Sequence, residues 1–358
     1  MRTVRIAALM AAIALIGPPP AAAWGYVGHR LIMSRAIELL PAGLKTFFTA
    51  NRGEIVARAI DPDLWRAAGW EDDPHHYLNF GVREFGEYPF TALPHEYGAA
   101  VEKFGMAALK RDGLLPWRLA EEFGNLRRAF EALKRSATAA PDVILFAPVM
   151  GHYIQDAHQP LHATNNYDGQ LTGNSGVHAR FERDLIERFQ SRLVLKPARA
   201  RALTNPREAG FDALLSSYRL VAAVLKADSE ASGGRNTYDD AYYEKFFTRT
   251  KAVLEERLAD AITVTAGLII GAWEQAGRPA AGNSEFGIPN SEFVRSFQNS
   301  EFFSRDHLSA SDRSGAVRVV LGTSRRGVVD CAPRRMDEAP AAPARRTLAQ
   351  RRSRRPAQ

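Results

Sequence analysis

Cysteine is nearly absent from this 358-residue sequence, which contains only Cys331. A single cysteine excludes an internal disulfide, so the fold must be stabilised by a large apolar core, by bound metal or by both. Strand patterns are absent too, since no stretch alternates apolar and polar residues between hairpin turns. Beyond the N-terminus, no apolar run approaches the roughly 20 residues needed to cross a bilayer. These absences favour an all-α protein without a transmembrane helix.

The N-terminus has the three parts of a signal peptide. Two arginines precede an apolar run over residues 6–16, and alanines at positions 21–23 form an A-x-A cleavage site. We therefore expect residues 1–23 to be removed by cleavage after Ala23, in the periplasm or outside the cell. Trp24 would then begin the mature protein, and its free α-amino group and carbonyl oxygen could together chelate a metal ion.

Positive charge is concentrated at the ends of the chain. The whole sequence carries a net charge of +7, but residues 24–278 contain 31 basic and 32 acidic side chains, a net charge of −1. Residues 279–358 are rich in Ala, Pro, Ser and Arg and repeat the tetrapeptide NSEF three times, a composition that favours a basic, disordered tail. Its arginine-rich end could contact nucleic acid or an anionic membrane. A solvated extension is the interpretation that we favour.

Apolar residues recur at helical spacing along most of the body. Seven segments show this pattern: residues 30–50, 94–111, 115–136, 140–157, 176–193, 208–227 and 239–277. The last of these should form a long, buried core helix. The stretch from Asp61 to Leu93 is rich in proline, glycine, histidine and aromatic residues, and we expect a long ordered coil there, a feature that usually carries function. The sequence thus predicts one all-α domain over residues 24–278.

Histidines and carboxylates gather between residues 152 and 182. His152 and Asp156 are four residues apart on a predicted helix, so both should point from one face toward one ion. Pro160 should end that helix and release His162 to a neighbouring position. A second pair, His178 and Glu182, repeats the spacing of four. Imidazole and carboxylate together suit zinc, with manganese or iron also compatible.

These motifs carry a resemblance to a known superfamily. The pattern HYxxDxHQPLH followed by HxxxE, with an N-terminal Trp in WGxxGH, resembles the superfamily that joins zinc-dependent phospholipase C to the single-strand nucleases of the S-one/P-one type. The resemblance covers most of residues 24–277. It implies a single all-helical domain with a cleft that holds three zinc ions. His158 lies two residues after Asp156, and we expect it to play a structural part.

The resemblance assigns the three zinc ions to nine residues: Trp24, His29, Asp63, His76, His152, Asp156, His162, His178 and Glu182. Asp63 is chosen because Pro62, Asp63 and Arg66 match a Pro-Asp-x-x-Arg stretch of the plant members, with Asp61 as the reserve candidate. His75, beside the implied ligand His76, should face solvent, and His95 has no support from any motif.

The resemblance also implies how the ligands are shared. The amine and carbonyl of Trp24 would hold the first ion together with His29, and Asp156 would bridge it to the second. His76, His152 and Asp63 would complete the second site. His162, His178 and Glu182 would hold the third ion.

The implied chemistry is hydrolysis of a phosphodiester. Zinc lowers the pKa of bound water to about 7, so water at the paired ions would attack phosphorus while the third ion stabilises the phosphoryl oxygens. Asp156 would be central to this reaction as the bridging ligand. Arg66 would either bind a phosphate through two hydrogen bonds or form an ion pair that supports the Asp63 segment.

The sequence leaves open whether the substrate is a nucleic acid or a phospholipid. WGxxGH and DxHQPLH resemble the nuclease branch, whereas Glu182 and the short interval after His162 resemble the phospholipases. Tyr77 lies where a nuclease would stack a base, which contributes about 1–3 kcal/mol, and Asn79 could read a base edge; Tyr77 could equally be a core residue. An apolar rim for a lipid surface could come from Trp65, Trp70, Phe80, Phe85 and Phe90, or these could pack the loop.

We therefore expect a secreted zinc phosphodiesterase, and an endonuclease acting on single-stranded DNA or RNA in preference to a phospholipase C. A zinc-binding protein without catalytic activity is a third hypothesis, which full retention of the implied ligands disfavours.

Overall fold

The computed structural model describes residues 24–280. The expected signal peptide at residues 1–23 lies outside the described residues, as does the expected tail from residue 281 onward. Within the described range the chain is helical and has no strands, apart from an isolated bridge between Phe80 and Thr164. The predicted all-α class is therefore confirmed.

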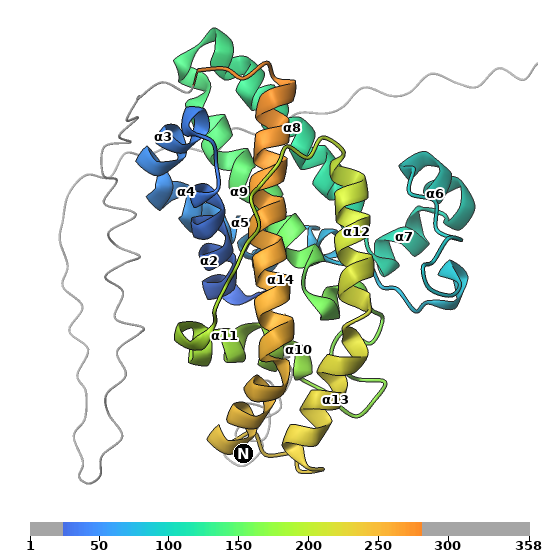
Figure 1. Ribbon diagram of the computed structural model, residues 1–358. Coiled ribbons are helices and arrows are strands. Elements are labelled where there is room, and N and C mark those ends of the chain that lie inside the picture. Colours follow the sequence, from blue (N-terminus) through green and yellow to red (C-terminus); the bar gives the residue numbers. More distant parts are fainter. Residues whose placement is uncertain (1–23, 281–358) are drawn as a thin grey trace, which may run out of the picture. The chain divides into compact units, whose positions relative to one another are not determined.

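The longest helix, α14 (Asp240–Gln275), lies among the other long helices in Figure 1. It packs against α2 (Gly25–Glu38), α8 (Leu115–Arg135), α9 (Ala140–Ala157) and α13 (Val221–Ser232). The Asp239 side chain caps α14 by accepting a hydrogen bond from the backbone nitrogen of Tyr242 at 2.9 Å. Buried leucine, isoleucine and alanine side chains along α14 make it the core helix that the sequence predicted.

Three predicted segments are each divided into two helices. Residues 30–50 form α2 and α3 (Ala42–Ala50), residues 94–111 form α6 (Tyr97–Phe104) and α7 (Met106–Asp112), and residues 208–227 form α12 (Pro206–Tyr218) and α13 (Val221–Ser232). Pro41 precedes α3 in extended conformation, and its ring prevents α2 from continuing through it. Gly105 separates α6 from α7 with a φ of 79°, which glycine adopts readily.

Two short helices were not predicted, α4 (Arg52–Arg58) and α5 (Asp61–Ala67). Both pack against α9. Helix α5 begins with Pro62 in its first turn, where the missing N–H costs no hydrogen bond. The expectation of coil from Asp61 onward is therefore wrong for this first part. The remainder contains only two 3₁₀ turns, Asp73–His76 and Arg83–Phe85.

The chain between α9 and α12 is built from short, irregular elements. They are a 3₁₀ turn (Pro160–Ala163), α10 (Val177–Ala179), a π-helix (Arg180–Asp184), α11 (Leu185–Phe189) and a 3₁₀ turn (Gln190–Arg192). The predicted helix over residues 176–193 is thus interrupted by a change of hydrogen-bond pattern. The chain then passes along α14, where the Leu203 nitrogen donates to the Gly267 carbonyl at 2.9 Å.

Aromatic residues of the long loop pack inward. Phe80, Phe85 and Phe90 are each at most 4 % exposed, and the rings of Phe80 and Phe90 stack with centroids 4.4 Å apart. Tyr218 of α12 meets the Phe90 ring edge-on at 4.9 Å. These three phenylalanines therefore pack the loop, the second of the two roles considered for them. Trp70, in contrast, is 65 % exposed.

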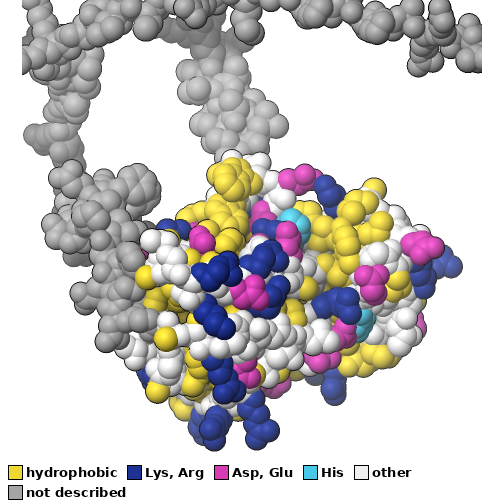
Figure 2. Space-filling model, turned by 90° about the horizontal axis from the view of Figure 1, so that it is seen from above, with side chains coloured by type: hydrophobic (Ala, Val, Ile, Leu, Met, Phe, Trp, Pro, Cys, Tyr) yellow, Lys and Arg dark blue, Asp and Glu magenta, His cyan; other side chains and the backbone are white. Residues whose placement is uncertain are grey.

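The surface of the described domain mixes charges of both signs. Figure 2 shows Lys and Arg side chains interspersed with Asp and Glu side chains on one face, in keeping with the near-neutral charge of residues 24–278. Among residues 24–280, no helix is both long and apolar enough to span a membrane.

Candidate metal centre

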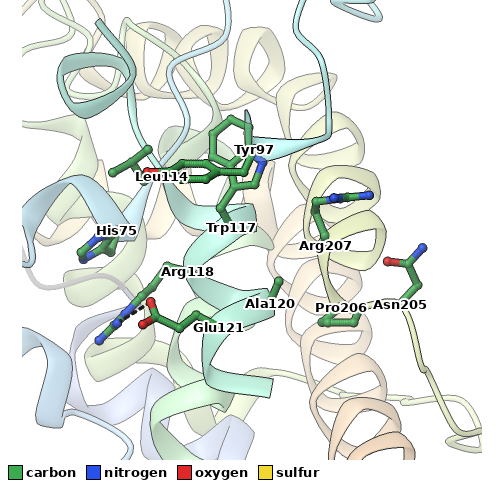
Figure 3. Close-up of a pocket in the computed structure, with 10 residues that line it drawn as sticks. All are labelled: His75, Tyr97, Leu114, Trp117, Arg118, Ala120, Glu121, Asn205, Pro206 and Arg207. Carbon is green, nitrogen blue, oxygen red and sulfur yellow. Dashed lines mark hydrogen bonds and ion pairs between the residues drawn. The ribbon is translucent and has the colours of Figure 1, made fainter. Parts of the chain in front are cut away.

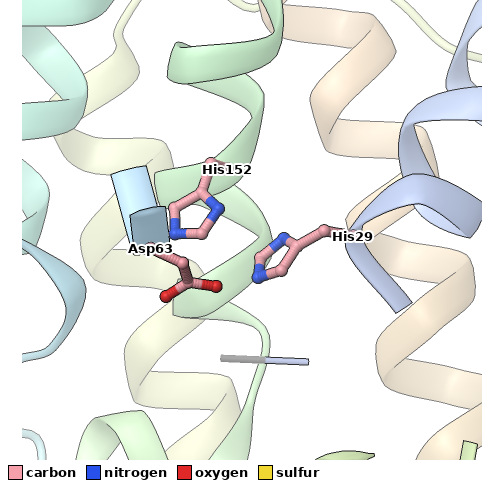
Figure 4. Close-up of side chains that lie close together, drawn as sticks. All are labelled: His29, Asp63 and His152. Atoms are coloured by element: carbon pink, nitrogen blue, oxygen red, sulfur yellow. The ribbon is translucent and has the colours of Figure 1, made fainter. Parts of the chain in front are cut away.

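Eight of the nine implied ligands converge as buried side chains that form three groups, each able to hold a metal ion. The groups are His29, Asp63 and His152; His76, His152 and Asp156; and His162, His178 and Glu182. Figure 4 shows the side chains of the first group turned toward a common point from three separate elements. Because His152 belongs to the first two groups, those five residues form one inner cluster. The other three residues form the outer group.

The inner cluster is carried by regular helices. His29 comes from α2, Asp63 from α5, and His152 and Asp156 from successive turns of α9, where a spacing of four places both on one face. His76 ends a 3₁₀ turn that packs against α9. None of these residues is more than 2 % exposed. The core packing of the helices thus fixes the positions of the inner ligands.

Asp156 lies at the centre of the cluster. Its Oδ1 is 3.2 Å from His29 Nε2, whereas its Oδ2 is 3.0 Å from His76 Nδ1 and 3.3 Å from His152 Nε2. The two oxygens of one carboxylate therefore face different histidines. A carboxylate placed in this way can bridge two neighbouring metal ions.

Four histidines have a protein oxygen as hydrogen-bond acceptor at Nδ1, the ring nitrogen that faces away from the metal groups. The Nδ1 atoms of His29 and His152 face Gln155 Oε1 at 2.7 Å and the Ala59 carbonyl at 2.9 Å. In the outer group, Nδ1 of His162 faces the His76 carbonyl at 2.5 Å, and Nδ1 of His178 faces the Tyr167 carbonyl at 2.9 Å. An acceptor at one ring nitrogen fixes the proton there and leaves the other nitrogen free to bind metal, as is usual for metal-binding histidines.

Unsatisfied polar atoms mark the same place. Among the buried polar atoms of the described residues that have no hydrogen-bond partner, five belong to these groups: His29 Nε2, Asp63 Oδ2, Asp156 Oδ1, His162 Nε2 and Glu182 Oε1. Buried polar atoms without partners are costly and rare, which points to a missing ligand. The donor set of imidazole nitrogens and carboxylate oxygens suits zinc, so the residues fit the ions that the resemblance implies.

The pKa values reflect the crowding of charge in the inner cluster. Burial alone would lower the pKa of His76, but hydrogen bonds to Asp156 and Asp72 raise it to about 9. Burial would raise the pKa of Asp156, but the neighbouring histidines, His152 first among them, hold it well below its usual range. For His152 itself burial prevails, and its pKa is lowered.

The outer group shows the same balance with fewer charges. Burial would raise the pKa of Glu182, but the charge of His178 and hydrogen bonding to His162 and His178 lower it to about 2. Burial opposes the charge on His178, and the adjacent Glu182 carboxylate nevertheless raises its pKa. Each group thus favours ionised carboxylates, the form that binds a cation.

Trp24 is completely buried beside the outer group. Its backbone nitrogen donates to Glu182 Oε2 at 3.2 Å, and its indole nitrogen donates to the Gln155 carbonyl at 2.6 Å. The residue has a φ of 49°, a left-handed conformation that is uncommon for a side chain other than glycine. The structure therefore places the Trp24 nitrogen at Glu182, although the resemblance groups it with His29.

Asp63, Asp61 and Arg66 occupy distinct environments. Asp63 is 2 % exposed and its Oδ1 lies 3.9 Å from His76 Nδ1, whereas Asp61 pairs with Arg58 at 3.2 Å outside the cluster. Arg66 binds Asp63 at 3.1 Å, which is the supporting ion pair considered from the sequence. The geometry therefore favours Asp63 over Asp61.

The candidate substrate residues lie next to His76. Tyr77 and Asn79 are both partly buried, and burial raises the pKa of Tyr77 to about 12. Asn79 has a buried Oδ1 without a hydrogen-bond partner among the described residues. Trp65 and the exposed Trp70 stack with centroids 5.9 Å apart.

The remaining histidines of the domain lie outside the metal groups. His158 binds the Ile154 carbonyl at 2.7 Å, as a structural residue would. His95 stacks on Phe211 at 3.7 Å. His75, expected to face solvent, is only partly exposed and binds Asp72 at 2.8 Å.

A pocket of about 630 Å³ lies between α8 and the start of α12 (Figure 3), with His75 at its edge and Arg118 paired with Glu121 inside it. A second pocket of about 380 Å³ shares His75 and Arg118 and reaches Asp72. No member of the inner cluster or outer group lines either pocket.

Sequence reasoning missed two residues that support the ligands, Asp72 and Gln155. Gln155 directly precedes the ligand Asp156, and Asp72 lies four residues before His76. A carboxylate four residues before a candidate histidine ligand could have indicated Asp72 as a partner of His76.

The chain matches no protein-family model and no curated protein sequence. Functional inference therefore rests on the geometry of these groups.

Proposed function

We propose that this protein is a zinc-dependent phosphodiesterase that hydrolyses single-stranded DNA or RNA. The observation that carries the proposal is the position of Asp156, whose two oxygens face separate histidines of a buried cluster, with a third ligand group close by. His162 connects the two, since its Nδ1 lies 3.9 Å from Asp156 Oδ2 and its Nε2 lies 3.6 Å from Glu182 Oε2. Ions held by these neighbouring groups would supply the positive charge that hydrolysis of a phosphodiester needs.

Zinc bound by these residues would supply Lewis acidity that activates water and neutralises the charge that develops on phosphoryl oxygens. The protein itself supplies the arrangement. Asp156 and the inner histidines would hold the ions, and because these side chains are buried, the electrostatic contacts among them are stronger than in water. Arg66 holds Asp63 in place by their ion pair, and so supports the inner cluster from outside.

The nuclease function is favoured over a phospholipase function by the aromatic residues. Phe80, Phe85 and Phe90 are buried in the loop, so they offer no rim for a lipid surface. The stacked pair Trp65 and Trp70 is the part of the expected rim that remains. Tyr77, next to His76, is only partly buried, and base stacking requires an accessible ring at such a position.

The proposal includes export and removal of the leader. Cleavage after Ala23 would convert the Trp24 amide nitrogen, now 3.2 Å from Glu182 Oε2, into a primary amine. A neutral amine has a lone pair for a metal ion, whereas an amide nitrogen does not. We therefore propose that the processed form binds all three ions and acts in the periplasm or outside the cell.

The decisive experiment compares hydrolysis of single-stranded DNA and of phosphatidylcholine micelles by the processed, zinc-loaded protein. We expect faster release of nucleotides, and Tyr77→Ala should then raise KM for DNA by about 5- to 150-fold, the loss of one stacked base. Faster release of phosphocholine would instead identify a phospholipase C and give Trp65 and Trp70 the role of a lipid contact. Zinc binding without hydrolysis of either substrate would support a protein that only binds zinc.

A further inference from the structure

His76 is oriented differently from the other four histidines of the centre. Those four direct Nε2 into the centre and bind a protein acceptor through Nδ1. In His76 the inward atom is Nδ1, which lies 3.0 Å from Asp156 Oδ2 and 3.1 Å from His152 Nε2. Its Nε2 lies 3.1 Å from Asp72 Oδ2. His76 is also the one among these five whose rear acceptor is a carboxylate.

Asp72 is itself held in a defined position. It is 6 % exposed, its Oδ2 accepts a hydrogen bond from the Tyr153 hydroxyl at 2.9 Å, and its Oδ1 faces His75 Nδ1 at 2.8 Å. Tyr153 follows the ligand His152 on α9, and the guanidinium of Arg118 lies 5.5 Å from the centroid of the Tyr153 ring. Helix α9, which carries the ligands His152 and Asp156, thus also carries the residue that fixes Asp72.

Asp72 does not have the ordinary role of a residue that precedes a turn. It is the N-cap residue of the 3₁₀ turn Asp73–His76, yet its side chain makes no capping hydrogen bond to that turn. Both carboxylate oxygens are directed instead to His75, His76 and Tyr153.

We propose that Asp72 is a positioning residue that makes Nδ1 the metal-binding atom of His76, by accepting the proton of Nε2. A neutral imidazole carries one proton, so a strong acceptor at Nε2 leaves the Nδ1 lone pair for a metal ion. A carboxylate acceptor also makes the ring a stronger ligand than a carbonyl would. The inference rests on the metal centre of the proposed function, and on no particular substrate.

The test uses Asp72→Asn in the processed protein, with Glu71→Gln as the matched control. Glu71 is the adjacent acidic residue; its side chain is 76 % exposed and pairs with Lys110 on the surface. Zinc affinity is measured by chelator competition and zinc content by elemental analysis. We expect Asp72→Asn to weaken one inner zinc by about 10- to 100-fold, with the outer zinc unchanged and Glu71→Gln the same as the wild type.

A second readout addresses the histidine directly. In the zinc-loaded wild type, the ring ¹⁵N shifts of His76 should show metal at Nδ1 and a proton at Nε2, and Tyr153→Phe, which keeps the carboxylate, should preserve this pattern with a smaller loss of affinity. Metal at Nε2 of His76, or equal weakening of all three ions by Asp72→Asn, would overturn the inference. Selective weakening in a protein that hydrolyses no diester would retain the inference while refuting the proposed function.

Discussion

The inner cluster and the outer group use the same kinds of ligand on two different kinds of backbone. Inner ligands come mainly from α2, α5 and α9, which pack into the core. Outer ligands come from a 3₁₀ turn, from the three-residue α10 and from a π-helix. Helix packing therefore fixes the inner cluster, whereas the outer group depends on hydrogen bonds made by loops.

Two residues, Asp168 and Arg180, make hydrogen bonds that hold the backbone of the outer group. Asp168 accepts hydrogen bonds from the backbone nitrogens of Gly176 and His178, at 2.9 and 3.3 Å. Arg180, within the π-helix, binds Asp228 of α13 at 3.0 Å, and both side chains are almost fully buried. Disturbing the outer group should thus be possible without disturbing the inner cluster, and the predictions below rest on that difference.

The largest effect should come from Asp156→Asn, which removes the charge that both parts of the inner cluster share. Loss of several kcal/mol of charge stabilisation should lower kcat by more than about 1,000-fold. Kinetics on single-stranded DNA, with circular dichroism to check the helical fold, provide the measurement. Unchanged turnover in a folded variant would remove Asp156 from the catalytic centre.

A form that begins Met-Trp24 should lose one zinc and most of its activity, because the added residue turns the Trp24 amine back into an amide. The ion that is lost would show which ligands the Trp24 nitrogen joins. The structure places the Trp24 nitrogen at Glu182, whereas the resemblance pairs it with His29. Zinc content of the extended and processed forms is the measurement, and equal content would contradict the role of the amine.

Arg180→Gln should destabilise the fold by about 3–5 kcal/mol, because it leaves the buried Asp228 carboxylate without its cationic partner. We expect the outer zinc to dissociate first and the inner cluster to keep its ions. Urea unfolding and zinc release by a chelator test this, with Arg183→Gln as the control, since Arg183 is the neighbouring arginine on the same π-helix with its side chain 48 % exposed. Simultaneous loss of all ions would show that the two parts are not separable.

The smallest expected effect concerns the metal-free protein at the extremes of pH. The pKa of His76 is raised from 6.5 to about 9, so its contribution to stability is complete below pH 6.5 and is lost as the pH rises through 9. The pKa of Glu182 is lowered from 4.5 to about 2, so its contribution is present above pH 4.5 and is lost as the pH falls toward 2. The midpoint of thermal unfolding, measured across pH, reports both losses: the decrease at alkaline pH (the alkaline limb) and the decrease at acid pH (the acid limb).

Single substitutions separate these limbs. Glu182→Gln should flatten the acid limb and leave the alkaline limb, and His76→Gln should flatten the alkaline limb. A Glu182→Gln protein with an unchanged acid limb would show that other carboxylates control acid unfolding.

Prediction from the sequence succeeded where apolar residues recur at helical spacing over many residues. The segments expected at residues 115–136, 140–157 and 239–277 agree closely with α8, α9 and α14, since each buries a continuous stripe of apolar residues. It failed for α4, whose sequence RGEIVAR is too short and polar to show a stripe. Local patterns also cannot reveal which carboxylate reaches His76, because the contacts of Asp72 and Asp156 with it depend on how the 3₁₀ turn packs against α9.

The motifs located the candidate ligands, but they did not show which ligands belong to which metal group. His152 is within reach of both inner groups, and the Trp24 nitrogen lies at the outer group. Spacing along a helix determines which residues share a face, but only tertiary packing determines which faces meet.

The π-helix at Arg180–Asp184 has a consequence for protein engineering. A π turn, closed by i→i+5 hydrogen bonds, takes one residue more than the α-helical turn that it replaces. Imposing α-helical geometry on this segment while keeping every residue would let α10 and α11 join as a regular helix, but would rotate everything beyond Glu182 by about 100° relative to His178. The buried side chains of α11 would then leave the core or pull the outer ligands out of place. A stabilisation programme that idealises this helix would therefore select against metal binding.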